Sequence, residues 1–138
     1  MSHEKLHQEA IRWYRQGVDD LEAAQALLLA KKFAQACFYA QQSAEKSLKA
    51  VWVSLDGDPW GHSCTRLLRD LPEPAQAQLI PLLELTLALD KLYIPTRYPD
   101  ALAELTPGEA FTQREAESAL AAAEQILNHV QQWLQGDG

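Results

Sequence analysis

"FAQACFYAQQSAEKSLKAVWVSL", residues 33–55, carries apolar side chains at intervals of three and four residues. That spacing is the period of an amphipathic α-helix with one buried face. The residues on this face are Phe33, Ala36, Cys37, Ala40, Ala44, Leu48, Val51, Trp52 and Leu55. Because three of them are alanines in the first half of the stretch, a neighbouring helix can approach closely there. The stretch predicts a long helix that packs tightly against another one.

The preceding residues, about 4–30, predict that other helix. Their apolar side chains, from Leu6 to Leu28, follow the same spacing. Gly17 lies in the interior of this segment, where glycine costs roughly 1 kcal/mol relative to alanine. We therefore expect either a close helix neighbour at Gly17 or a bend. The connection at residues 30–32 is very short, so the two helices should form an antiparallel hairpin.

The middle of the chain reads as a turn followed by two helices. Residues 56–61, DGDPWG, are typical of a turn. A short helix is expected at about 63–71, with Ser63 as its N-cap, and the following prolines end it. A longer helix should then run over about 74–93, with Pro81 tolerated near its start or leaving a small kink.

The last third of the chain predicts a long loop and a final helix. The loop covers residues 94–111. Thr112 and Glu115 have the spacing of a capping box, which opens a helix over about 113–135. No alternating strand pattern occurs. We predict an all-α fold, an up-down helical bundle of four long helices plus one short helix, in a single domain spanning residues 1–138.

Composition narrows the classes of function. The 138 residues carry a net charge of −7, which argues against a broad nucleic-acid surface but leaves room for a local basic pocket. Two cysteines, Cys37 and Cys64, lack the spacing of a zinc site and are expected in the core, and the aspartates form no evident cluster for a metal. The glycines form no P-loop or dinucleotide fingerprint, so no cofactor is predicted. No apolar run could span a membrane or serve as a signal peptide, and we expect a cytoplasmic protein.

Three strings in order carry a resemblance to a known family. The first is Q-x-A-E-K-x-L-K-A at residues 42–50, the second is G-H-S at residues 61–63, and the third is L-D-x-x-Y-I-x-x-R-Y-P-D at residues 89–100. Together they resemble the HEPN domain family in its prokaryotic, nucleotidyltransferase-associated form. The resemblance implies a helical bundle that forms a homodimer and partners a minimal nucleotidyltransferase. It also implies nucleotide or RNA binding, in many cases within a toxin-antitoxin system.

A large branch of that family cleaves RNA with an arginine and a histidine separated by four to six residues. None of the four histidines, His3, His7, His62 and His129, follows an arginine at that spacing. This departure argues against catalysis and predicts no catalytic residue. One route remains open, in which the fold brings Arg97 and His62 together in space.

Lys46 and Lys49 are the first candidates for a ligand site. With Gln42 they occupy positions i, i+4 and i+7, so the three share one face of their helix. The face could be an ordinary solvated flank in which Glu45 pairs with Lys49. Alternatively, both lysines join Arg97 in a cationic patch for a phosphate.

The loop sequence YIPTRYPDA, residues 93–101, supplies the other candidates. Its two prolines stiffen the chain, so side chains can be aimed at a ligand with little loss of entropy. Tyr98 suits stacking on a base and Arg97 suits a phosphate, while His62 and Asp100 would orient the site. The same side chains could instead lock the loop onto the bundle, with Asp100 pairing Arg97 or capping a turn, or they could form a dimer contact.

Two other functions stay open. In the first, the protein is an interaction or dimerisation module without a ligand, and exposed tryptophans at positions 13, 60 or 133 carry the contact. In the second, it is a ribonuclease whose site departs from the family motif. Nucleotide or RNA binding beside a nucleotidyltransferase is the function that the sequence favours.

Overall fold

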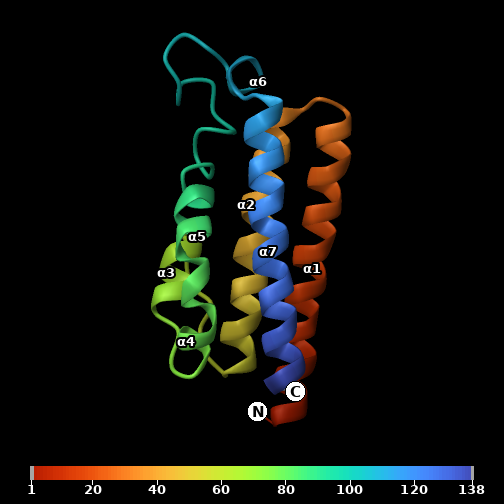
Figure 1. Ribbon diagram of the computed structural model, residues 1–138, viewed down its shortest axis with the longest axis vertical. Helices are drawn as coiled ribbons and strands as arrows, with labels where there is room; N and C mark the ends of the chain where they lie inside the picture. Colours follow the sequence, from red (N-terminus) through yellow and green to blue (C-terminus); the bar gives the residue numbers. More distant parts are fainter. Residues whose placement is uncertain (1, 138) are drawn as a thin grey trace.

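Helices and turns make up the computed structural model, which describes residues 2–137 and contains no strand in that range. Three long helices, α1 (His3–Leu29), α2 (Phe33–Ser54) and α7 (Gln113–Asp137), run along the molecule (Figure 1). Shorter helices flank α2 on the side opposite α1: α3 (Cys64–Arg69), α4 (Ala75–Leu79) and α5 (Leu83–Asp90). The prediction of an all-α helical bundle is confirmed.

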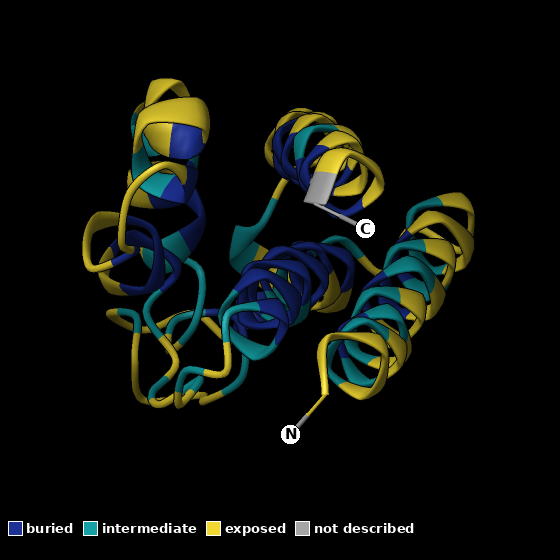
Figure 2. Cartoon of the chain, turned by 90° about the horizontal axis from the view of Figure 1, so that it is seen from below, coloured by how far each residue is buried: buried dark blue, intermediate teal, exposed yellow. Residues whose placement is uncertain are grey.

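α2 is the central helix of the bundle. It packs against α1, α7, α3 and α5, and Figure 2 shows it as the most completely buried helix. Ala36, Ala40 and Ala44 are fully buried, as their spacing predicted. The core also takes both cysteines, which are free thiols. Burial and the nearby carboxylate of Glu115 raise the pKa of the Cys37 thiol to about 12.

The close approach predicted at Gly17 is present between α1 and α2. A Cβ atom on Gly17 would lie 3.0 Å from the carbonyl oxygen of Ser43. The Ser43 hydroxyl donates a 2.6 Å hydrogen bond to the Gly17 carbonyl. Glycine is therefore needed for contact between the helices rather than for a bend.

A Schellman turn joins α1 to α2. Lys32 N–H bonds to Leu27 O at 2.8 Å, and Lys31 N–H bonds to Leu28 O at 3.0 Å, which satisfies the last carbonyls of α1. Lys31 takes the left-handed conformation, with φ of 63°, at the position where glycine is usual. The predicted antiparallel hairpin is thus closed by three residues.

The helix predicted over 74–93 is interrupted. A 3₁₀ helix, η1 (Ile80–Leu82), separates α4 from α5, and it lies at Pro81. Proline has no N–H to donate and crowds the preceding turn, which explains the tighter winding. Instead of the small kink predicted there, the helix changes to 3₁₀ geometry at Pro81, and regular helix ends at Asp90.

The segment predicted as a loop over 94–111 contains one further helix, α6 (Pro107–Ala110). Thr106 and Glu109 form a capping box around it. The capping box predicted at Thr112 and Glu115 is also present, and its reciprocal bonds of 2.9 and 3.2 Å open α7. The capping box at Thr106 and Glu109 is the one sequence signal for α6. A helix of four residues is too short to add a periodic apolar pattern as a second signal.

Not all of the tryptophans that were expected to be exposed are exposed. Trp133 was predicted to be exposed, but it is buried, and its indole N–H donates to the Ser54 hydroxyl at 3.4 Å. That prediction is wrong because Trp133 lies on the face of α7 that packs toward the end of α2. Trp60 is 77% exposed, and Trp13 is half-buried.

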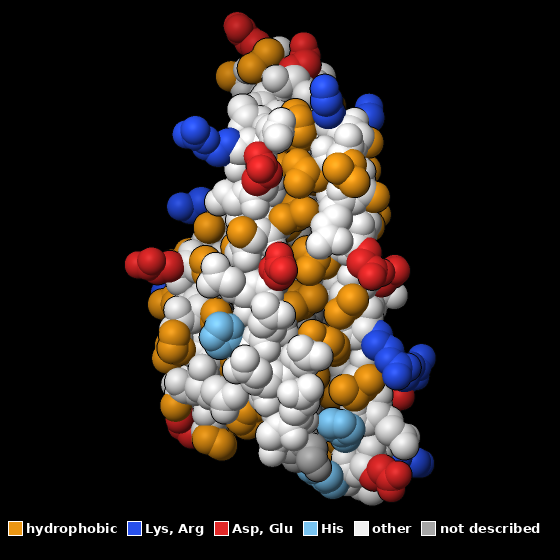
Figure 3. Space-filling model, turned by 45° about the vertical axis from the view of Figure 1, so that its right-hand side comes forward, with side chains coloured by type: hydrophobic (Ala, Val, Ile, Leu, Met, Phe, Trp, Pro, Cys, Tyr) orange, Lys and Arg blue, Asp and Glu red, His pale blue; other side chains and the backbone are white. Residues whose placement is uncertain are grey.

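The face seen in Figure 3 carries a band of apolar side chains with charged side chains along its margins. A cleft of about 260 Å³ between α1 and α7 is lined by His7, Ile11, Tyr14, Gln131, Leu134 and Gln135.

None of the helices in residues 2–137 combines the length and apolar character that crossing a membrane requires.

Candidate functional site

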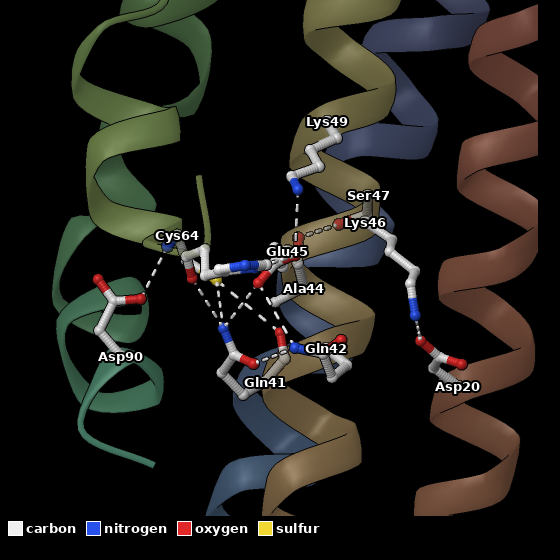
Figure 4. A network of polar contacts seen from close by, with 11 residues as sticks. Asp20, Gln41, Gln42, Ala44, Glu45, Lys46, Ser47, Lys49, Cys64 and Asp90 are labelled. Atoms are coloured by element: carbon white, nitrogen blue, oxygen red, sulfur yellow. Dashed lines mark hydrogen bonds and ion pairs between the residues drawn. The ribbon is translucent and has the colours of Figure 1, made fainter. Parts of the chain in front are cut away.

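Polar side chains extend from α2 in two directions (Figure 4). Toward α1, the ammonium group of Lys46 forms an ion pair with the buried carboxylate of Asp20. Toward α3 and α5, a second group of polar side chains gathers around Glu45. Lys46 pairs with Asp20 and Lys49 pairs with Glu45, so a carboxylate balances the charge of each lysine that was predicted to bind a phosphate.

Lys49 is held inside the bundle. Its Nζ lies 3.2 Å from Oε2 of Glu45, which confirms the i, i+4 ion pair that the sequence allowed. The same Nζ lies 5.8 Å from the centre of the Trp13 ring, a cation–π distance. Lys49 is only 8% exposed and Glu45 only 3%. A ligand could reach this ammonium group only if the pair opened.

Glu45 connects this buried pair to the surface. Gln41 and Gln42 donate to its Oε1 at 3.3 and 3.4 Å, and its Oε2 lies 3.4 Å from Nδ1 of His62. Gln41 also donates to the backbone carbonyl of His62 at 3.1 Å. The His62 side chain is 61% exposed. A buried carboxylate thus holds one edge of a surface imidazole.

Arg97 lies among aromatic rings. Its Nε donates to the carbonyl of Tyr93 at 2.9 Å, which folds the side chain back over the chain. The guanidinium carbon lies 4.7, 4.3 and 5.0 Å from the ring centres of Phe38, Tyr93 and Tyr98. The His62 ring stacks on Tyr93 with 5.0 Å between centres and 17° between planes. We call these five residues (Phe38, His62, Tyr93, Arg97 and Tyr98) the aromatic platform.

The platform reaches the surface. Tyr98 is 47% exposed, and the neighbouring Tyr39, whose ring lies edge-on to Phe38 at 5.6 Å, is 37% exposed. Planar groups with open faces can stack on a base, and a guanidinium beside them can donate to phosphate oxygens. The platform therefore has the chemistry of a nucleotide contact, and it also fixes the loop to α2 through Phe38.

The structure brings together three of the six predicted ligand residues. His62, Arg97 and Tyr98 belong to the platform, and His62 and Arg97 contact the same ring although no sequence motif joins them. The exposed Asp100 forms no ion pair with Arg97 among the described residues.

Lys46 lies at a different cleft. This cleft, of about 530 Å³, is lined by Glu9, Arg12, Trp13, Arg15, Gln16 and Lys46, and its lining includes no residue of the platform. Convergence of both lysines with Arg97 on one ligand stays a prediction, and we centre the candidate site on the platform.

Asp90 positions the turn that carries His62. Its carboxylate accepts hydrogen bonds from the Ser63 hydroxyl at 2.8 Å and from the backbone N–H groups of Cys64 and Thr65 at 2.7 and 3.0 Å. The predicted cap is also present, since Ser63 Oγ accepts from Arg66 N–H at 3.1 Å. The last residue of α5 thus caps the first turn of α3.

Sequence patterns did not single out several of these residues. Phe38 was not singled out, Tyr93 was noted only as part of the loop sequence at residues 93–101, and Asp90 was noted in the string at residues 89–100 and among aspartates that form no metal cluster. Asp90 follows Ser63 by 27 residues, and no local spacing links a cap to a helix so distant. The available signal was an acidic residue at a helix end, within the string at residues 89–100 that carries the family resemblance.

The chain is similar to several known proteins. The HEPN domain family profile matches residues 10–133. The protein TT1696 from Thermus thermophilus shares 41% identity and superposes with a TM-score of 0.83, over 89% of this chain and 96% of that one. ST0689, an archaeal HEPN homologue, shares 34% identity with a TM-score of 0.75, over 91% and 97% of the two chains.

Two further similarities are more distant. A HEPN domain protein from Thermotoga maritima shares 30% identity with a TM-score of 0.67, over 90% of this chain and 98% of that one. A Methanocaldococcus jannaschii protein named "Putative toxin MJ1304" is 28% identical over 125 residues, which is 84% of this chain and 82% of that protein. The match of the family profile to residues 10–133, together with these structural similarities, shows that this chain belongs to the HEPN domain family.

Proposed function

We propose that this protein binds nucleotides or single-stranded RNA at the aromatic platform and acts in a toxin-like system with a minimal nucleotidyltransferase. The observation that carries the binding proposal is the position of Arg97, whose guanidinium lies 4.3 to 5.0 Å from three aromatic rings beside the exposed Tyr98. Stacking of one base on an aromatic ring contributes about 1–3 kcal/mol in proteins that bind single strands.

The orientation of Arg97 supports a phosphate contact next to that stack. Its Nε is used by the Tyr93 carbonyl, and the two terminal nitrogens carry four further N–H donors. Those donors form no side-chain hydrogen bond among the described residues. Because the rings already hold the guanidinium in place, a phosphate would gain a charge-assisted contact at a small cost in side-chain entropy.

Lys46, Lys49 and Asp100 complete the set of residues that we propose to affect the ligand. Each lysine is balanced by a carboxylate, Asp20 or Glu45, so its effect should be smaller than that of Arg97. Asp100 is exposed and is separated from Tyr98 by one proline. The nucleotide affinities of the single alanine variants of these three residues rank their contributions relative to those of the platform residues.

Calorimetric titration with a nucleoside monophosphate tests the binding proposal. Arg97→Ala should weaken binding at least about tenfold, and Tyr98→Ala should weaken it by about five- to a hundredfold, as expected for loss of one stack. Arg114→Ala is the matched control, since Arg114 is exposed at the start of α7 and lies outside the platform. Equal affinity of wild type and Arg97→Ala would refute the assignment.

The partner and the toxin-like role rest on similarity. The resemblance of residues 42–50, 61–63 and 89–100 to nucleotidyltransferase-associated HEPN proteins supports the partner, and the name of the Methanocaldococcus jannaschii relative supports the toxin-like role. Expression of the chain alone should arrest bacterial growth, and co-expression of a minimal nucleotidyltransferase should relieve the arrest. Light scattering on the purified chain tests the homodimer that we also propose. Full growth with the chain alone would count against the toxin-like role.

RNA cleavage is the second candidate function, and one contact favours it. Glu45 Oε2 lies 3.4 Å from His62 Nδ1, an arrangement in which a carboxylate can orient an imidazole and leave Nε2 free to exchange a proton. Incubation of structured RNA with wild type and His62→Ala separates cleavage from binding. Cleavage by the wild type that His62→Ala abolishes would establish this candidate, and intact RNA in both reactions would dismiss it.

A further inference from the structure

A second concave surface lies next to the platform, between the end of α2, the turn at residues 55–63 and α3. This pocket has a volume of about 220 Å³. Its lining includes two indoles, two basic groups and two carboxylates, supplied by Trp52, Trp60, His62, Arg66, Asp58 and Asp70. We call it the tryptophan pocket.

The walls of the tryptophan pocket are fixed by the fold. Trp52 N–H donates to the carbonyl of Leu67 at 2.8 Å. Gly57 lies against the same indole so closely that a Cβ atom there would come within 2.6 Å of the ring. Gly61 adopts φ of 91°, a conformation that favours glycine, directly after Trp60. The turn therefore carries Trp60, which is 77% exposed, into the lining of the pocket that also contains the fixed indole of Trp52.

His62 joins the tryptophan pocket to the platform. It lines the pocket, and its ring also stacks on Tyr93 at 5.0 Å. Tyr93 in turn lies 4.3 Å from the guanidinium of Arg97. One side chain is thus shared by the two surfaces, and a series of stacked planar groups runs from His62 through Tyr93 and Arg97 to Tyr98.

The chemistry of the tryptophan pocket fits a base rather than a second phosphate. Indole faces stack on any base, and Arg66 at the rim can contact the phosphate attached to it. Asp58 and Asp70 would repel a phosphate, but a carboxylate accepts hydrogen bonds from the donor edge of a base. Guanine presents adjacent N–H donors on its Watson–Crick edge, and uracil presents one donor between two acceptors. The volume suits one base and its sugar.

We propose that the tryptophan pocket is a second nucleotide subsite that selects guanine, while a neighbouring nucleotide of the same strand lies on the platform. The ligand is then a guanine-containing single-stranded RNA rather than a free mononucleotide. This inference rests on the proposed binding function of the platform. It adds a separate specificity that platform residues alone do not provide.

Fluorescence anisotropy with two labelled RNA octamers, oligouridine and oligouridine with one central guanine, tests the inference. Wild type should bind the guanine-containing octamer at least about tenfold more tightly, as one bidentate hydrogen-bonded contact to a base edge provides. The double variant Asp58→Ala/Asp70→Ala should remove this difference, because the acceptors for the guanine edge are lost, whereas Trp60→Ala and Arg66→Ala should weaken the binding of both octamers. Arg69→Ala, in the same helix but outside the pocket lining, should behave as wild type.

The outcomes separate this inference from the platform proposal. Equal binding of both octamers by wild type, or a preference that survives in Asp58→Ala/Asp70→Ala, overturns the guanine subsite. If Arg97→Ala binds oligouridine as wild type does, the proposal that the platform binds RNA is overturned. The guanine subsite is then judged by the guanine preference alone. Circular dichroism of each variant shows that the helices are retained, so a change in affinity reports the site.

Discussion

Replacement of Asp90 by alanine removes the connection between the end of α5 and the start of α3. Three hydrogen bonds of 2.7 to 3.0 Å reach its carboxylate, two from backbone N–H groups and one from a hydroxyl. A hydrogen bond to a charged group contributes about 1.5–3 kcal/mol net. Asp90 is half-buried and the Ser63 cap remains, so water can replace part of the loss. We expect the free energy of unfolding to fall by about 2–4 kcal/mol.

Urea unfolding followed by far-ultraviolet circular dichroism measures this loss. In thermal unfolding, the same loss of free energy should lower the melting temperature of a domain of this size by roughly 8–16 °C. Asp90→Asn keeps one acceptor oxygen and should lose about half as much free energy. Asp100→Ala, at an exposed position without a described side-chain hydrogen bond, should change stability by less than about 0.5 kcal/mol.

The result for Asp90→Ala decides whether the carboxylate acts as a cap across two helices. A loss below about 0.5 kcal/mol, equal to that of the Asp100 control, would refute the reasoning from its hydrogen bonds. A large loss together with weaker nucleotide binding would show that the cap also positions the turn that carries His62.

Three further predictions concern the core. Gly17→Ala should destabilise the protein by about 1 kcal/mol in chemical unfolding despite the better helix propensity of alanine, because the new Cβ atom meets the Ser43 carbonyl at 3.0 Å; a gain in stability would contradict the close approach. Because the pKa of Cys37 is raised from 9.0 to about 12 in the folded state, its contribution to stability is complete below pH 9 and is lost as the pH rises toward 12. Between pH 8 and pH 10 wild type should therefore lose about 1.4 kcal/mol more unfolding free energy than Cys37→Ala, and equal losses would contradict the burial of the thiol. Trp133→Phe should cost about 0.5–1.5 kcal/mol through the lost indole bond to Ser54, and a melting temperature equal to that of wild type would show that this bond contributes nothing.

The fold was predictable because local rules determine most of it. Apolar spacing located α1, α2 and α7, and the capping box at Thr112 and the N-cap at Ser63 marked where helices begin. The interruption at Pro81 was less predictable, since a proline near a helix start can be tolerated or can break the helix. The prediction that Trp133 is exposed was wrong for a different reason. Its position near the end of α7 carried no indication that α2 ends beside it.

The candidate site was predictable only in part. Residue chemistry identified Arg97, Tyr98 and His62, which the fold gathers around Tyr93. The charges of Lys46 and Lys49 suggested a phosphate, but the partner of Lys46 lies 26 residues earlier in the chain. Ion pairs between distant elements depend on helix packing, and a single sequence does not reveal which carboxylate faces which ammonium group.

The Schellman turn between α1 and α2 also matters while the chain is being synthesised. Helices joined by three residues meet through contacts that are close in sequence, and such contacts form fast. Once residues 3–54 have left the ribosome, the hairpin can bury its seam at Gly17 and Ser43 before α7 has been translated. The open side of that nascent hairpin is the apolar surface that α7 later covers, so this surface stays exposed to aggregation until α7 emerges.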